Sequence, residues 1–185
     1  MSVDMINREV QKIKKKYKET DPFRLCRAMG ILVLYAPMGS GNKCCKGFFL
    51  SQSRKRAVTV NSDMSPLLQR MIVAHELGHA VLHSKSSGIK AFHDFRVFDT
   101  VSQMESEANI FAADLLMDDA DVLELLNDDI CFYEAASRLN VLPELLDFKF
   151  RVLKQKGYKI TGSPVVSDGT FLKNIETGSY GANDR

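Results

Sequence analysis

The feature that most constrains this chain is a pair of histidines four residues apart in an apolar segment. The segment is Met71-Ile-Val-Ala-His75-Glu76-Leu-Gly-His79-Ala-Val-Leu-His83, and it contains the pattern H-E-x-x-H. Residues four apart lie on one face of an α-helix, so a helix would turn both imidazoles toward a single ion. Two histidines and one further protein ligand leave a zinc coordination position for water. The segment therefore predicts a catalytic metal site, with Glu76 beside it.

The surrounding sequence favours a helix. Ser65-Pro66 supply an N-cap and a first-turn proline, apolar residues continue from Leu67 to Leu82, and Ser86-Ser-Gly88 predict the stop. Gly78 costs about 1 kcal/mol of helix propensity relative to alanine, and we expect it to admit a strand or a substrate backbone. The alternative to a metal site is two histidines satisfied by hydrogen bonds on a half-buried helix.

A third ligand is expected from a second helix, predicted from about Val101 to Met117. Glu105 and Asn109 are four apart on one face of it, so the carboxylate could bind the ion while the amide hydrogen-bonds a ligand. The small residues Ala108 and Ala112 would permit a close approach of the two helices.

Three points about these residues stay open. Ser102-x-x-Glu105 has the form of a capping box that would occupy Glu105, although Thr100-x-x-Gln103 could cap the helix instead. Glu107 is the other carboxylate that could bind the ion. His83 lies one turn beyond His79 but falls short of the third ligand position in H-E-x-x-H-x-x-G-x-x-H, so we expect it to support a ligand or to pack beside the site.

The two motifs together carry a family resemblance. The stretch from His75 to His83, followed by Glu105-Ser-Glu-Ala-Asn-Ile-Phe-Ala-Ala-Asp-Leu-Leu-Met117, resembles the ImmA/IrrE family of zinc metallo-endopeptidases, and the similarity covers residues 1–155. The resemblance matches the first glutamate of the E-x-x-A segment to the third ligand, which favours Glu105. Asp118 stands where the family often has proline, a departure outside the metal site.

This combination implies peptide hydrolysis with one zinc ion. His75, His79 and Glu105 would hold Zn²⁺, and Glu76 would accept a proton from the metal-bound water and pass it to the leaving amine. By resemblance, the substrate would be a helix-turn-helix repressor of a mobile element or stress regulon. The alternative is a non-catalytic, zinc-stabilised protein that binds a regulator or contacts DNA. His93, Tyr35 and Tyr133 are the candidate hydrogen-bond donors to the oxyanion.

The expected fold is α+β, with a zincin-like core in which a small antiparallel sheet packs on the H-E-x-x-H helix. An amphipathic helix opens the chain, and a short helix spans Phe23 to Met29. The apolar run from Ile31 to Ala36 predicts a buried strand, and residues 46–51 and 56–61 predict a hairpin. The metallopeptidase domain is expected over residues 1–157, with a helix-turn-helix-like appendage at 130–157 and an extended or partly disordered tail at 158–185.

Charge and cysteine content argue against other functions. The net charge is +2, from 25 Lys+Arg and 23 Asp+Glu, so it gives no general reason to expect nucleic acid. The residues from Glu134 to Leu146 have helix-turn-helix spacing, but Glu144 and Asp147 stand where phosphate contacts would be needed. The four cysteines form no C-x-x-C, and no run is long enough for a membrane span. We therefore expect a cytoplasmic protein with free thiols.

Overall fold

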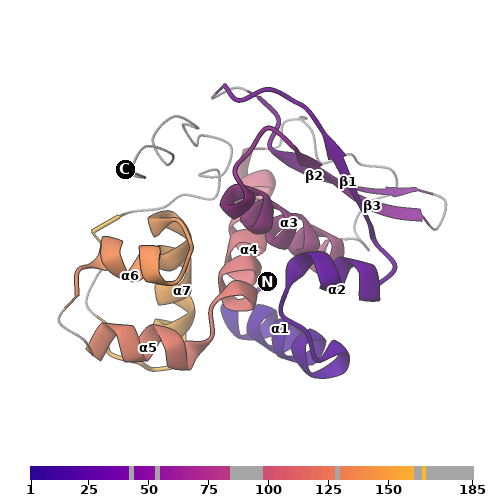
Figure 1. Ribbon diagram of the computed structural model, residues 1–185. Helices are drawn as coiled ribbons and strands as arrows, with labels where there is room; N and C mark the ends of the chain where they lie inside the picture. The colour runs from indigo at the N-terminus through magenta and orange to yellow at the C-terminus, as the bar shows by residue number, and fades with distance from the viewer. Residues whose placement is uncertain (42–43, 53–54, 84–97, 128–129, 161–163, 166–185) are drawn as a thin grey trace.

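The protein is described by a computed structural model that covers residues 1–41, 44–52, 55–83, 98–127, 130–160 and 164–165. Helices and a small sheet form an α+β arrangement with the sheet at one end of the molecule (Figure 1). In chain order the elements are α1 Val3–Tyr17, α2 Pro22–Ala28, β1 Leu32–Ala36, β2 Gly47–Gln52, β3 Lys55–Asn61, α3 Pro66–Leu82, α4 Phe98–Leu116, α5 Asp119–Asn127, α6 Phe132–Arg138 and α7 Pro143–Gln155.

The sheet has the strand order β1-β3-β2. Strands β2 and β3 form the predicted hairpin and pair antiparallel, with Phe49 opposite Val58. Strand β1 pairs parallel to β3 on the other side, with Val33 opposite Val58. The sheet is therefore mixed, and the prediction of an antiparallel sheet is wrong for β1. The hairpin fixes only the β2–β3 pairing, and it leaves the second edge of β3 open to a strand of either direction.

The prediction that β1 is a buried strand is also wrong. Leu32, Leu34 and Tyr35 are 60%, 49% and 58% exposed. Strand β1 lies at the edge of the sheet. A short apolar run can form either an edge strand or a central strand, because hydrophobicity alone does not fix strand order. Val33 is the β1 residue that packs against the hydrophobic core beside Val58.

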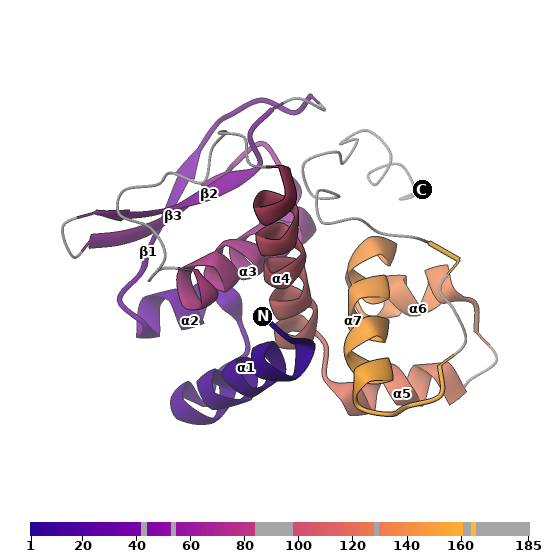
Figure 2. The same cartoon turned by 180° about the vertical axis from the view of Figure 1, so that it is seen from behind.

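The helices below the sheet are set by local signals in the sequence. The side chain of Ser65 accepts a hydrogen bond from the backbone N–H of Leu68 and caps α3, with Pro66 in the first turn. Asp21 caps α2 in the same way. Helix α1 buries Ile6, Val10 and Ile13. These three helices and α4 surround one core, as the two opposite views show (Figures 1 and 2).

Gly78 of α3 lies where α4 comes closest. A Cβ atom at Gly78 would stand 3.2 Å from the Cα atom and the carbonyl oxygen of Ala108, and 3.2 Å from the Phe111 ring. The expectation that Gly78 admits a strand or substrate backbone is therefore wrong, because the space is taken by the second helix. Ala108, predicted to permit close helix packing, is the residue that does so.

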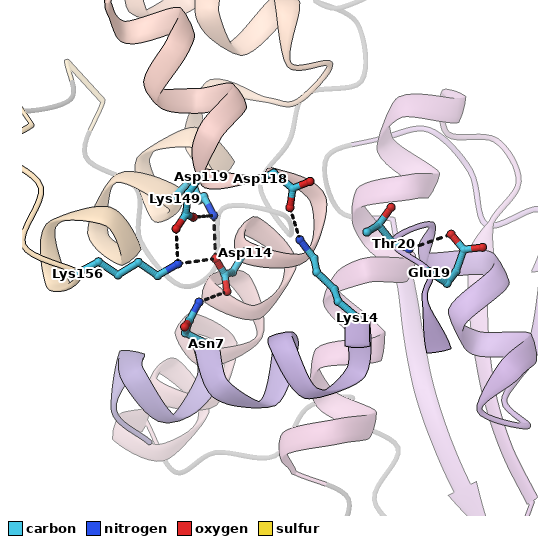
Figure 3. Close-up of polar contacts among 9 residues, drawn as sticks. All are labelled: Asn7, Lys14, Glu19, Thr20, Asp114, Asp118, Asp119, Lys149 and Lys156. Carbon is cyan, nitrogen blue, oxygen red and sulfur yellow. Dashed lines mark hydrogen bonds and ion pairs between the residues drawn. The ribbon is translucent and has the colours of Figure 1, made fainter. Parts of the chain in front are cut away.

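The C-terminal helices α5 to α7 lie on the opposite side of α4 from the sheet (Figure 2). A buried ion cluster joins them to the core (Figure 3). Lys149 of α7 is 1% exposed, and its ammonium lies 2.7 Å from Asp114 of α4 and 2.6 Å from Asp119 of α5. Asn7 of α1 donates a hydrogen bond to the other carboxylate oxygen of Asp114 at 2.6 Å, and Lys156 pairs with Asp119 at 2.6 Å.

The start of α4 differs from the prediction. The helix begins at Phe98, so Thr100 and Ser102 lie inside it and neither is an N-cap. The predicted stop of α3 at residues 86–88 lies outside the described residues, as does most of the predicted tail. Among the described residues, no helix combines the length and apolar character of a membrane span.

Candidate metal centre

Three of the predicted site residues converge between α3 and α4. His75 and His79 are one helical turn apart on α3, and their Nε2 atoms are 3.0 Å apart. Glu105 reaches across from α4, with Oε2 at 3.3 Å from Nε2 of His75 and Oε1 at 3.7 Å from Nε2 of His79. All three side chains are buried. Their ligand atoms lie within 4.8 Å of one another.

His75 is oriented by Asn109. The Nδ1 atom of His75 lies 2.8 Å from the amide oxygen of Asn109, one turn after Glu105 on α4. An amide oxygen only accepts hydrogen bonds, so Nδ1 of His75 carries the proton. In the neutral ring, the lone pair is then on Nε2, which faces Glu105. Asn109 therefore stands where the sequence predicted a partner for a ligand.

His79 is held on its other side by a second histidine. His83 caps the C-terminus of α3, and its Nδ1 lies 2.9 Å from Nδ1 of His79. Nε2 of His83 lies 3.0 Å from Oε2 of Glu107 on α4. His83 is thus in contact with a candidate ligand and is not itself among the three converging residues. Glu107 faces His83, whereas Glu105 faces the two other histidines.

The contacts between His83, Glu107 and Gln103 were not predicted. Gln103, one turn earlier on α4, donates a hydrogen bond to Oε1 of Glu107 at 2.9 Å, and the amino group of Met1 contacts the same oxygen. The sequence offered one signal, since His79 and His83 are four apart on one helix and so are Gln103 and Glu107. It offered none for the register between α3 and α4, which brings His83 to Glu107.

Charges and burial act in opposite directions on the protonation of these groups. Burial lowers the pKa of His75, but the hydrogen bond and charge of Glu105, with Glu76 and Asn109, outweigh it and raise the pKa. Burial also lowers the pKa of His83, and there the Glu107 contact offsets it only in part. For Glu107, burial would raise the pKa, but hydrogen bonds from Met1, His83 and Gln103 lower it. The net effect on His83 is a pKa below the ordinary histidine value.

The converging atoms suit a cation. Each of the two Nε2 atoms presents a lone pair when its ring donates from Nδ1, and Glu105 adds carboxylate oxygens, so electron-pair donors meet in a buried space. Such a set binds either a proton, as the raised pKa of His75 indicates, or a metal ion. Ligands of a tetrahedral zinc at about 2.0–2.1 Å would be separated by about 3.3 Å. The distances of 3.0, 3.3 and 3.7 Å are close to this spacing.

The remaining predicted residues lie at different distances from this cluster. Glu76 follows His75 on α3, is 7% exposed, and its charge acts on both His75 and Cys45. Tyr35 stacks on Phe23 of α2. Tyr133 lies on α6, among the C-terminal helices. His93, the third residue considered as an oxyanion donor, lies outside the described residues.

Comparisons with known proteins find a family model and relatives that match most of the chain. Residues 26–151 match the family model described as the IrrE N-terminal-like domain. The chain is 30% identical over 145 residues to "Uncharacterized immunity region protein 2" of Bacillus phage phi105, which covers 78% of this chain and 89% of the relative. It is 23% identical over 133 residues to "Metallopeptidase ImmA" of Bacillus subtilis (strain 168), and this alignment covers 72% of this chain and 73% of that protein. The family match includes the H-E-x-x-H helix and Glu105.

Proposed function

Because the chain belongs to the ImmA/IrrE family of metallopeptidases, we propose that it is a zinc-dependent endopeptidase that cleaves a transcriptional repressor. The observation that carries this proposal is the convergence of His75, His79 and Glu105 in a buried space where their electron-pair donors meet. A structural zinc site is closed by four protein ligands, whereas three ligands leave a position for water.

We assign each of these residues a separate role in hydrolysis. His75, His79 and Glu105 would hold the ion, which, when bound, supplies a water of lowered pKa and polarises the scissile carbonyl. Glu76 follows a ligand directly in the chain and is not one of the three clustered residues. We assign it the role of general base, which would take a proton from that water and deliver it to the leaving amine. Asn109 would keep Nε2 of His75 unprotonated and directed at the ion.

The architecture supports a zincin-like core. The H-E-x-x-H helix α3 packs beneath β2 and β3, and Gly47 of β2 lies directly over Ile72 of α3. A substrate approaching the ion would pass beside this sheet. We infer that the sheet and α3 form the catalytic half of the protein, while α5 to α7 support α4 from its other side.

The substrate class is inferred from the relatives. One is named as a protein of a phage immunity region and another as the metallopeptidase ImmA. Immunity in a prophage is maintained by a repressor, so a helix-turn-helix repressor encoded near this gene is the substrate that we propose. Since such repressors act on DNA in the cytoplasm, the proposal places the protein there as well.

The test compares the wild type with Glu76→Gln. We expect both proteins to bind one zinc ion, and only the wild type to cleave a repressor encoded beside the gene, because removal of a general base typically costs 10²–10⁴-fold in rate. Zinc content is measured on the purified proteins, and cleavage is followed by electrophoresis and mass spectrometry. Equal cleavage by the two proteins would refute the role of Glu76. Zinc binding without cleavage by either would favour a regulator-binding protein.

A further inference from the structure

Two buried residues beside the candidate ligands, His83 and Glu107, have no part in the proposed hydrolysis. They connect α4 to the ligand His79 by an unbroken line of polar contacts. Glu107 Oε2 lies 3.0 Å from Nε2 of His83, and Nδ1 of His83 lies 2.9 Å from Nδ1 of His79. The line ends at Nε2 of His79, which faces Glu105.

The direction of each hydrogen bond follows from the chemistry of the groups. The carboxylate of Glu107 only accepts, so Nε2 of His83 must carry a proton. Above its pKa the ring of His83 has one N–H, and with that N–H on Nε2 the lone pair is on Nδ1. This lone pair can contact His79 at 2.9 Å only as an acceptor, so Nδ1 of His79 carries the proton. Its lone pair is then on Nε2, the atom that a metal ion would need.

We propose that Glu107 and His83 are positioning residues that fix His79 in the tautomer with its Nε2 lone pair directed at the metal. The inference rests on the proposed function, because it concerns the same metal ligands. At His75, the acceptor for the Nδ1 proton is the amide oxygen of Asn109. At His79, the corresponding position is taken by the imidazole of His83, which is itself oriented by a carboxylate.

The anchoring of Glu107 supports this role. Gln103 donates a hydrogen bond to its second oxygen at 2.9 Å from the preceding turn of α4. The carboxylate is thus held from its own helix while it receives the proton of His83 from α3. A carboxylate that contributed only to the surface charge of α4 would be solvated, whereas Glu107 is 6% exposed.

The first measurement uses the metal-free wild type. The ¹⁵N chemical shifts of the histidine rings, recorded above the ordinary histidine pKa of about 6.5, report which nitrogen of each ring is protonated. We expect His79 to carry its proton on Nδ1 and His83 on Nε2. A His79 ring with a proton on Nε2 and none on Nδ1 would overturn the proposal, and this result needs neither zinc nor substrate.

The second measurement separates positioning from packing with two variants of one residue. In His83→Gln, the amide oxygen can still accept from His79 and the amide N–H₂ can still donate to Glu107. In His83→Leu, the volume stays filled and both hydrogen bonds are lost. We expect the leucine variant to bind zinc about 10–100-fold more weakly in chelator competition and to lose the Nδ1–H preference of His79. The glutamine variant should recover most of both properties.

The outcomes distinguish this inference from the proposed function. If the wild type binds zinc and His83→Leu matches it in affinity and in the tautomer of His79, the relay is refuted and the metal site stands. If the wild type shows the expected tautomers but binds no zinc, the proposed function fails while the hydrogen-bond line is supported. Circular dichroism shows whether each variant is folded, and the wild-type tautomer remains decisive if the leucine variant is not.

Discussion

At the scale of single residues, two glutamates of α4 that are two positions apart have different surroundings. Glu105 faces Nε2 of both His75 and His79, whereas Glu107 faces His83 and Gln103. We expect Glu105→Gln to lower the affinity for zinc by more than about 100-fold. Mutation of a residue that only orients a ligand typically lowers metal affinity 10–100-fold, and a ligand should matter more. Glu107→Gln should keep most of the affinity, because the amide oxygen can still accept the proton of His83.

The measurement is zinc affinity by chelator competition, with both variants at the same pH. The two substitutions remove one negative charge each from buried positions on the same helix, so each serves as the control for the other. The opposite ranking would make Glu107 the ligand and would move the metal toward His83.

The sequence predicted the ligand candidates because their spacing is local. His75 and His79, and likewise Glu105 and Asn109, are four apart, and a helix brings such pairs to one face whatever the rest of the chain does. It could not rank Glu105 above Glu107 without the family resemblance, because that choice depends on how α3 and α4 are rotated against each other. The same rotation decides that His83 meets Glu107.

At the scale of elements, the distance between α3 and α4 is set by Gly78. Alanine in place of a helical glycine ordinarily gains up to about 1 kcal/mol of helix propensity. Here the added methyl would meet the Ala108 backbone and the Phe111 ring, all at 3.2 Å, so a neighbouring helix must move. We expect Gly78→Ala to destabilise the protein by about 1–3 kcal/mol, as overpacking does. Urea unfolding gives the free energy.

The same substitution should also weaken zinc binding, because Glu105 lies on the helix that must shift and the histidines lie on the other. A variant that gains stability and keeps its zinc affinity would show that α3 and α4 can separate without cost. Close helix packing would then no longer explain the glycine in the motif.

A second junction between elements is the ion cluster around Lys149. Its ammonium is shared by Asp114 and Asp119. Removing it leaves the buried carboxylate of Asp114 without its closest cation, whereas the partly exposed Asp119 keeps its contact with Lys156. We expect Lys149→Met to cost about 3–5 kcal/mol of unfolding free energy, as breaking a buried ion pair does. Lys154→Met, at an exposed position of the same helix, should change stability by less than about 0.5 kcal/mol. Similar losses in both variants would contradict this assignment.

Element boundaries were predictable where a capping residue marks them, and strand neighbours were not. Helix α3 begins after Ser65 and helix α2 after Asp21. In each case the side chain of the capping residue accepts a hydrogen bond from a backbone N–H of the first turn, and proline follows the cap. Asn140, which follows the C-cap of α6, has a left-handed conformation with φ of 53°. Strand β1, by contrast, obtains its edge position and parallel direction from β3, a contact distant in sequence that no local pattern encodes.

At the scale of the whole molecule, the arrangement of α6 and α7 bears on the alternative of a DNA-contacting protein. A recognition helix must present an exposed face to the major groove. Helix α7 instead packs on α4, and its buried residues include Asp147 and Lys149. Helices α6 and α7 therefore have the spacing of a helix-turn-helix, but α7, the second of them, packs on α4.

This packing predicts that the protein does not bind DNA specifically. We expect no shift of DNA from the region of its own gene in electrophoretic mobility assays at physiological salt, where the repressor encoded nearby serves as the positive control. Any weak binding should be independent of sequence and fall steeply with added salt, as phosphate contacts do. A salt-resistant, sequence-specific complex would require α7 to separate from α4. That separation would break the contacts of Lys149 with Asp114 and Asp119. The Lys149→Met variant would in that case bind DNA more tightly than the wild type, whereas we expect it to bind no better.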